Sequence, residues 1–141
     1  MSNTEENKAI ARREIEEIWN QEQLDVIDEI FAADFVFHVL GSPDIQGPEG
    51  YKQFVTMYRT AFPDLQFTIK DQIAEEDKVV IRWSTTGTHK GELMGIPPTG
   101  LPAPTPGITI GRYTGGKVVE AWACWDALGM LQQLGVVPPM G

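Results

Sequence analysis

The stretch from Gly116 to Gly135 constrains the fold most, because its pattern predicts a strand joined directly to a helix. From Lys117 to Trp125, apolar residues occupy both alternating faces of the predicted strand, since successive strand side chains point to opposite sides. A strand that is apolar on both faces is usually covered on both sides. Asp126 then stands where a helix N-cap belongs, ahead of an apolar helical stripe. We therefore expect a covered strand that leads into a packed C-terminal helix.

The rest of the chain predicts helices first and a hairpin-connected sheet afterwards. Apolar residues at helical spacing predict helices over 4–21, 24–31 and 48–61. Alternating apolar and polar residues predict strands over 35–40, 65–73, 79–89 and 108–111. This order is typical of an α+β fold. We expect a single domain, residues 1–141, in which a curved antiparallel sheet wraps around the N-terminal helices and forms a cone.

Composition limits the partners of the chain. Twenty acidic and eleven basic residues give a net charge of −9, which disfavours nucleic acid and anionic membranes as partners. The chain has no apolar run of about 20 residues and its start lacks the apolar run of a signal peptide, so we expect a cytoplasmic protein. The single cysteine, Cys124, and two widely separated histidines predict no internal disulfide, no metal site and no metal cofactor.

A long segment rich in proline and glycine runs from Gly91 to Gly107. So many residues that interrupt regular structure predict a loop, and a loop of this length in a compact domain is commonly functional. We expect it to form the rim of a pocket. If the helix that starts at Pro48 leaves the cone unfilled, the mouth of the cone lies under this loop and forms a small-molecule site.

Three motifs support a resemblance that covers nearly the whole chain. They are FPDLQFTIKDQIAEEDKVVIRW from Phe62, GTHKGELMGIPPTG from Gly87 and GKVVEAWACWDALGMLQQLG from Gly116. With the order of elements, they resemble the SnoaL-like polyketide cyclases, or ester cyclases, of the nuclear-transport-factor-2-like (NTF2-like) superfamily. This resemblance implies the cone-shaped NTF2-like α+β barrel and a cofactor-independent aldol ring closure of a polyketide ester. The same fold hosts isomerases, dehydratases, epoxide hydrolases and non-catalytic binding proteins.

The resemblance also implies a homodimer and a catalytic carboxylate. Relatives pair through the outer sheet face, which here carries Arg82, Ser84, Thr86 and Thr88. In the cyclases, the aspartate that acts as general acid and base lies on the last strand, at the position that Ala123 occupies here. Alanine cannot transfer a proton, so the mechanism of the family does not carry over unchanged. Ala121 and Ala123 together predict a wide and weakly polar pocket.

Three residues are candidates to replace the missing aspartate, and each has a structural alternative. Asp126 is the nearest carboxylate, but aspartate is also a preferred helix N-cap. His89 shares a strand face with Trp83 and leads into the proline-rich loop, where it could hydrogen bond a substrate oxygen, exchange a proton or simply hold the loop. His38 ends the first strand, with a parity that points it away from the pocket. We expect Glu120 to point outward too and to pair with Arg82 or Arg112.

Aromatic and thioether side chains suit the pocket to a small hydrophobic or aromatic ligand. We predict that the ligand contacts Tyr58, Phe62, Trp83, Met94 and Trp125 above a floor of Ala121 and Ala123. The first hypothesis is an enzyme that acts on an aromatic or polyketide-like carbonyl compound by proton transfer. The alternatives are a non-catalytic binding protein, which the alanine at 123 favours, and an isomerase or hydrolase that uses His89 or Asp126 in the same cavity.

Overall fold

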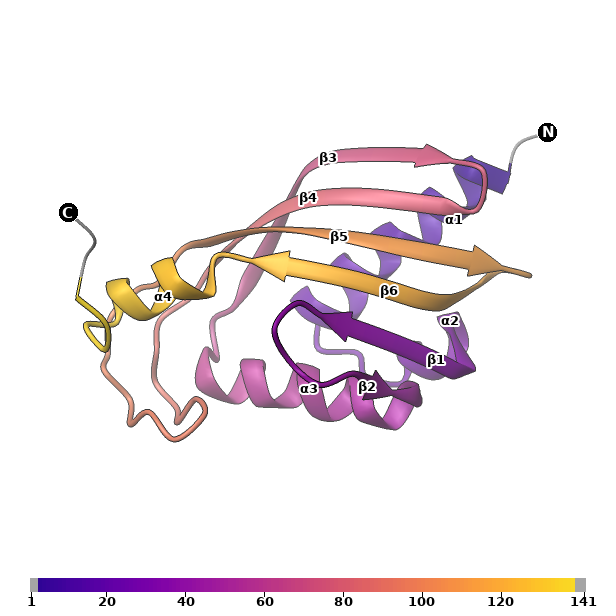
Figure 1. The fold of residues 1–141 in the computed structure, drawn as a ribbon. Coiled ribbons are helices and arrows are strands. Elements are labelled where there is room, and N and C mark those ends of the chain that lie inside the picture. Colours follow the sequence, from indigo (N-terminus) through magenta and orange to yellow (C-terminus); the bar gives the residue numbers. More distant parts are fainter. Residues whose placement is uncertain (1–2, 139–141) are drawn as a thin grey trace.

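A computed structural model describes residues 3–138, and it shows a curved sheet whose concave side is occupied by helices (Figure 1). The sheet has six strands in the order β2-β1-β6-β5-β4-β3. The strands are β1 (Phe31–Val39), β2 (Ile45–Gln46), β3 (Gln66–Glu75), β4 (Lys78–Thr86), β5 (Thr105–Thr114) and β6 (Lys117–Trp125). The expected α+β architecture, with a curved sheet around N-terminal helices, is confirmed.

The sheet is mixed rather than wholly antiparallel. Strands β3, β4, β5 and β6 pair antiparallel in chain order, and β2 pairs antiparallel with β1. Strand β1 instead lies parallel to β6, which corrects the expectation of a purely antiparallel sheet. The two strands are far apart in sequence, so no tight hairpin forces them to run in opposite directions.

Helices pack against the concave side of the sheet as a second layer (Figure 1). Helix α1 (Asn3–Arg13) continues without a break into a π-helical segment, η1 (Glu14–Asn20), followed by the short α2 (Val26–Ile30) and by α3 (Gly47–Ala61). The predicted first helix is therefore present, but its second half is wider than an α-helix. Ile18, Ile27 and Val55 are fully buried, so the apolar stripes of these helices build the core against the sheet.

Two strands extend beyond the predicted ranges by three residues or more at one or both ends, namely β1 and β5. Strand β1 begins directly after α2. It includes a stretch that breaks the alternating pattern, and a register shift between Phe31 and Val36 in its pairing with β6 accommodates this stretch. Strand β5 includes Pro106, which lacks an N–H group but still accepts a hydrogen bond from the Asp126 amide through its carbonyl. The two-residue β2 was not predicted. Strand β6 has the predicted bounds, and α4 (Ala127–Gln133) follows it as expected.

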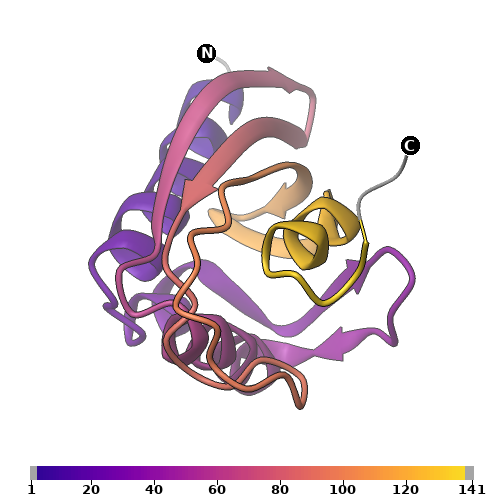
Figure 2. The same cartoon turned by 90° about the vertical axis from the view of Figure 1, so that its left-hand side faces the viewer.

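The proline-rich loop and α4 lie at the same end of the sheet (Figure 2). Between β4 and β5 the chain forms only isolated bridges, Thr88 with Pro102 and Leu93 with Ile96. Backbone amides of Lys90 and Gly91 donate to the Ala61 carbonyl, which anchors the loop to the end of α3. No helix within residues 3–138 is long and apolar enough to cross a membrane.

Candidate functional site

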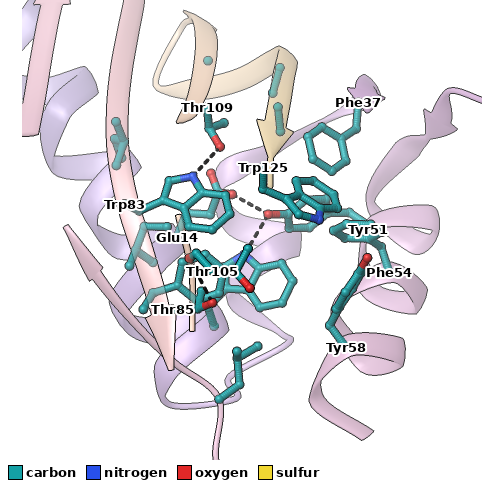
Figure 3. A pocket seen from close by; sticks show the side chains of 18 of the residues that line it. Glu14, Phe37, Tyr51, Phe54, Tyr58, Trp83, Thr85, Thr105, Thr109 and Trp125 are labelled. Carbon is teal, nitrogen blue, oxygen red and sulfur yellow. Dashed lines mark hydrogen bonds between the residues drawn. The ribbon is translucent and has the colours of Figure 1, made fainter. Parts of the chain in front are cut away.

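A cavity lies between the concave face of the sheet and the helices η1 and α3 (Figure 3). It leaves about 80 Å³ in which the centre of a water molecule can lie. Most of its walls are apolar, and ten of the side chains that line it are aromatic. Six of the seven residues predicted to contact a ligand line it, namely Tyr58, Phe62, Trp83, Ala121, Ala123 and Trp125.

Small residues of β5 and β6 form the floor of the cavity. Ala121 pairs with Gly111, and Ala123 pairs with Thr109. Both alanines are buried, and their methyl groups leave the space that a larger side chain would fill. The cavity-facing side of β5 carries no aliphatic side chain, because its residues are Thr105, Gly107, Thr109, Gly111 and Tyr113.

Trp83 and Trp125 form the aromatic wall above this floor. The Trp83 indole lies directly over Gly107, where an added Cβ would come within 2.3 Å of its Cζ2 atom. Its Nε1 donates a hydrogen bond of 2.9 Å to the Thr109 hydroxyl. Trp125 contacts Trp83 and Tyr58, at ring-centroid distances of 6.4 and 5.9 Å. Glycine at 107 therefore allows the indole to lie flat against the sheet.

Glu14 is the one carboxyl group among the described residues that line the cavity. Its Oε2 accepts a 2.5 Å hydrogen bond from the Tyr51 hydroxyl (Figure 3). The Tyr51 hydroxyl in turn accepts a hydrogen bond of 3.0 Å from Trp19 Nε1. Burial raises the pKa of Glu14 from 4.5 to about 7, although the Tyr51 hydrogen bond opposes the shift. A carboxyl group with this pKa exchanges a proton readily near neutral pH.

Glu14 was not among the predicted site residues, although its spacing in the sequence carries a signal. Asn7, Ala11, Glu14 and Ile18 follow one another at spacings of four, three and four residues, which places them on one helix face. The other three residues of this set are buried. A carboxylate on a buried stripe is costly unless it has a partner or a function. Glu14 is also the first residue of η1, and π-helical turns are frequent at functional sites.

The remaining polar groups of the cavity come mainly from β5. Tyr113 is 5% exposed and lines the cavity, and burial together with the charge of Glu14 raises its pKa well above the usual value. Among the described residues of the lining there is no lysine, arginine or histidine. Within residues 3–138, no three His, Cys, Asp or Glu side chains are arranged so that they could hold a metal ion.

Two of the three predicted catalytic residues have structural roles at the open end of the sheet. The Asp126 carboxylate accepts a 2.8 Å hydrogen bond from the Gly129 amide and so caps α4. His89 is fully buried, and its Nδ1 lies 3.0 Å from the Thr99 hydroxyl and accepts from the Thr99 amide. Neither side chain lines the cavity. Asp126 is therefore the N-cap of α4, and His89 holds the proline-rich loop through Thr99.

His38 and Met94 also lie outside the cavity. His38 stacks on Trp122 and pairs with Asp44 at 3.0 Å and Glu120 at 2.7 Å, and these two carboxylates raise its pKa. Met94 is 62% exposed in the proline-rich loop. The structure therefore gives neither residue a place beside Glu14.

Glu120 points outward, as expected. Its carboxylate pairs with Arg112 at 3.1 Å, one of the two predicted partners. The other candidate, Arg82, pairs instead with Asp71 at 2.6 Å. Hydrogen bonds from His38 and Arg112 lower the pKa of Glu120. This ionic cluster stabilises the outer face and takes no part in the cavity.

Several solved structures share this fold over nearly their whole length. A proposed SnoaL-like polyketide cyclase from Jannaschia sp. CCS1 superposes with a TM-score of 0.90 at 25% identity, covering 99% of this chain and 98% of its own. AclR, a proposed hydroxylase from Streptomyces galilaeus, has a TM-score of 0.85 and 32% identity, with coverages of 98% and 86%. IdmH, a proposed polyketide cyclase from Streptomyces antibioticus, has a TM-score of 0.80 and 30% identity, with coverages of 92% and 99%.

Sequence comparison gives the same assignment. No curated protein matches the chain significantly. The model of the family described as SnoaL-like polyketide cyclase matches residues 9–134, which include both Glu14 on the helical side of the cavity and the alanine floor on the sheet side. The chain therefore belongs to the SnoaL-like polyketide cyclase family.

Proposed function

We propose that the protein catalyses an aldol-type ring closure of an aromatic or polyketide-like carbonyl compound, with Glu14 as the general acid and base. The observation that carries this proposal is the Glu14 carboxyl group, which lies in an apolar cavity with a pKa of about 7. The aromatic walls suit a flat hydrophobic ligand. The proposed general acid and base, Glu14, therefore lies on a helix, whereas the aspartate of the related cyclases lies on the last strand. At that strand position, Ala123 leaves room for the substrate.

The ring closure requires two proton transfers. The Glu14 carboxylate removes a proton from a carbon next to a carbonyl group, so that the C–H bond breaks and the electron pair moves to the carbonyl oxygen. The enolate carbon then forms a C–C bond with a second carbonyl group of the same molecule. The resulting alkoxide takes the proton back from Glu14, which restores the carboxylate. A pKa near the working pH suits a group that must accept and return one proton.

Two neighbours hold Glu14 ready for this role. The Tyr51 hydroxyl fixes one carboxylate oxygen, and the Trp19 indole fixes Tyr51. Tyr51 is 3% exposed and packs edge-on against Trp19 at a centroid distance of 6.3 Å. The second oxygen of Glu14, Oε1, has no hydrogen-bond partner among the described residues, so it is available to a substrate proton.

The test is turnover of an open-ring anthraquinone methyl ester, followed by chromatography and mass spectrometry. We expect Glu14→Gln to lower kcat by about 100-fold or more, because general acid–base catalysis typically contributes 10²–10⁴-fold. Glu16→Gln is the matched control, since Glu16 lies on the same π-helical segment and is exposed. kcat/KM of the unchanged protein should rise with pH around 7, as Glu14 loses its proton.

Other outcomes would favour the alternatives. Turnover by Glu14→Gln at the rate of the unchanged protein would refute Glu14 as the base. Tryptophan fluorescence measures binding of the ester. If the unchanged protein binds the ester without converting it, and only the Ala123→Asp variant converts it, the chain is a binding protein. A product that keeps the open ring but has a shifted double bond or a cleaved ester would indicate an isomerase or a hydrolase.

We also propose that the protein forms a homodimer through the outer face of the sheet, as the family resemblance implies. Ile108 is 47% and Trp122 is 37% exposed on neighbouring strands of this face. Arg82 pairs with Ile108 in the β-ladder and lies on the same face. Size-exclusion chromatography with light scattering measures the mass. A particle of 15.7 kDa, the mass of one chain, would contradict a dimer.

A further inference from the structure

We propose that the Tyr113 hydroxyl donates the hydrogen bond that stabilises the substrate's enolate oxygen when Glu14 removes the proton. The inference deepens the proposed function and rests on it. Tyr113 lines the cavity and its side chain is 5% exposed. Its hydroxyl group makes no hydrogen bond to another described residue. Among the described residues, the buried side-chain polar atoms without a partner are only Arg59 Nε and His89 Nε2, so the Tyr113 hydroxyl opens into the cavity, where a ligand oxygen could accept its hydrogen.

Most other hydroxyl groups of the cavity donate to the protein itself. Tyr51 donates to Glu14, Thr85 donates to the Thr105 carbonyl, and Thr105 donates to the Ala103 carbonyl. The hydroxyl groups of Tyr58 and Thr109 each have a hydrogen left to donate, so they are the competitors of Tyr113. Proximity to the base decides between them. The enolate oxygen is only two bonds from the carbon that gives up its proton, so its donor must lie near Glu14.

Position and electrostatics together favour Tyr113 over Tyr58 by this criterion. Tyr58 contacts Trp125, the last residue of β6 at the open end, at a ring-centroid distance of 5.9 Å. The charge of Glu14 raises the pKa of Tyr113. Burial alone raises the pKa of Tyr58, and Glu14 is not among the causes. Thr109 lies further towards the open end on the same strand, where it already accepts the Trp83 indole N–H. Tyr113 is therefore the free donor that is electrostatically coupled to the base.

Two backbone features give the Tyr113 ring this position. The β5–β6 ladder shifts register between Arg112, which pairs with Glu120, and Tyr113, which pairs with Val118. Such bulges turn a side chain away from the direction that a regular strand would give it, and they are common beside active sites. Glycine at 111 then makes room, because an added Cβ would lie 2.9 Å from both the Cε1 atom and the hydroxyl oxygen of Tyr113. The ring therefore lies over Gly111, next to the floor of the cavity.

This arrangement completes the proton transfer described above. While the C–H bond breaks and the proton moves to Glu14, negative charge develops on the carbonyl oxygen. Tyr113 donates its O–H to that oxygen and keeps its own proton throughout. The hydrogen bond is stronger to the enolate than to the neutral ketone. It therefore lowers the barrier more than it improves substrate binding.

The first test is kinetic. We expect Tyr113→Phe to lower kcat by roughly 10- to 100-fold, in line with the loss of one such donor, while KM changes less than about threefold. Because the hydroxyl has no partner, its removal should leave the thermal midpoint unchanged or slightly higher. A lower midpoint together with an unchanged kcat would assign Tyr113 a packing role and overturn the proposal. Tyr58→Phe tests the competing phenol, and a loss of kcat in this variant that equals or exceeds the loss in Tyr113→Phe would overturn the proposal.

The second test measures binding only, so it does not depend on turnover. Glu14→Gln imitates the protonated base, and 2-naphthol imitates the enolate oxygen on an aromatic frame. Titrations followed by tryptophan fluorescence give the affinity for 2-naphthol relative to naphthalene. We compare Glu14→Gln with the double variant that also carries Tyr113→Phe. We expect the second substitution to reduce the preference for 2-naphthol over naphthalene about tenfold, which is the contribution of one good hydrogen bond to affinity. Gly111→Ala should reduce it similarly by displacing the ring.

The outcomes separate this inference from the proposed function. If Glu14→Gln retains turnover, the proposed function fails, and the naphthol preference still decides whether Tyr113 is a donor in the cavity. If the preference for 2-naphthol over naphthalene is the same with tyrosine and with phenylalanine at position 113, the inference is overturned. A preference lost in Tyr58→Phe instead would assign the donor to the other phenol and would equally overturn it.

Discussion

Raising the pH from about 4.5 to above 8 should weaken the folded protein by about 3 kcal/mol through Glu14 alone. In the folded state Glu14 has a pKa of about 7, against 4.5 for an ordinary glutamate. Between these values the folded protein keeps a proton that the unfolded chain has released. The contribution to stability is therefore complete below pH 4.5 and is lost as the pH rises through 7. Each pKa unit of difference corresponds to about 1.4 kcal/mol, which gives the stated magnitude.

Urea unfolding at several pH values, followed by tryptophan fluorescence, measures the free energy of unfolding. The unchanged protein and Glu14→Gln are compared at equal chain concentration, because association would add to the apparent stability. His38 has a raised pKa and acts in the same direction at higher pH, but it is present in both proteins and cancels in the difference. The lowered pKa values of Glu17, Asp64 and Glu120 act at low pH and cancel as well.

The decisive quantity is the difference in unfolding free energy between the two proteins as a function of pH. We expect Glu14→Gln to gain about 3 kcal/mol relative to the unchanged protein between pH 4.5 and 8. A difference that stays constant within about 0.5 kcal/mol over this range would show that Glu14 titrates as an exposed glutamate. Glu14 would then lack the raised pKa that suits an acid and base near neutral pH.

Two further predictions concern the scaffold around the cavity. Asp126→Ala should lower the unfolding free energy by about 1 kcal/mol, the usual value of an N-cap, because Asp126 caps α4 through the Gly129 amide. The kcat of this variant should stay unchanged. A loss of kcat beyond about tenfold in the fully folded variant would restore Asp126 as a catalytic candidate. Gly107→Ala should cost about 1–3 kcal/mol, because its Cβ would lie 2.3 Å from the Trp83 indole. Unchanged stability and tryptophan fluorescence in that variant would contradict the placement of the indole.

The parts of the fold that were predictable from sequence are those with a regular pattern. Alternation from Lys117 to Trp125 gave the bounds of β6, and the position of Asp126 before an apolar stripe gave the start of α4. Strand β1 was harder, because Ala33 and Asp34 interrupt its pattern and a register shift absorbs the interruption. The parallel pairing of β1 with β6 depends on contacts between distant segments, which local periodicity does not reveal.

The candidate site was predictable on the sheet side and missed on the helix side. Strand parity placed Ala121, Ala123 and Trp125 on the cavity face. Glu14 lies within the charged run from Arg12 to Glu17, which is typical of a solvated helix face, so its place on the buried stripe was obscured. The change from α- to π-helix at this residue has no marker in the sequence. The burial that raises the pKa of Glu14 becomes visible only once the sheet covers η1.

The π-helical segment also affects how the first helix tolerates a change in length. A π-turn holds more residues than an α-turn, so deleting one residue between Glu16 and Asn20 would allow the segment to relax to an ordinary α-helix. The turns on either side would then keep their rotation about the axis, and Glu14 would still face Tyr51. A deletion within the α-helical part, Asn3–Arg13, has no extra residue to absorb it, and it would rotate the preceding residues by about 100°. The segment that carries the base can thus lose a residue without moving the base.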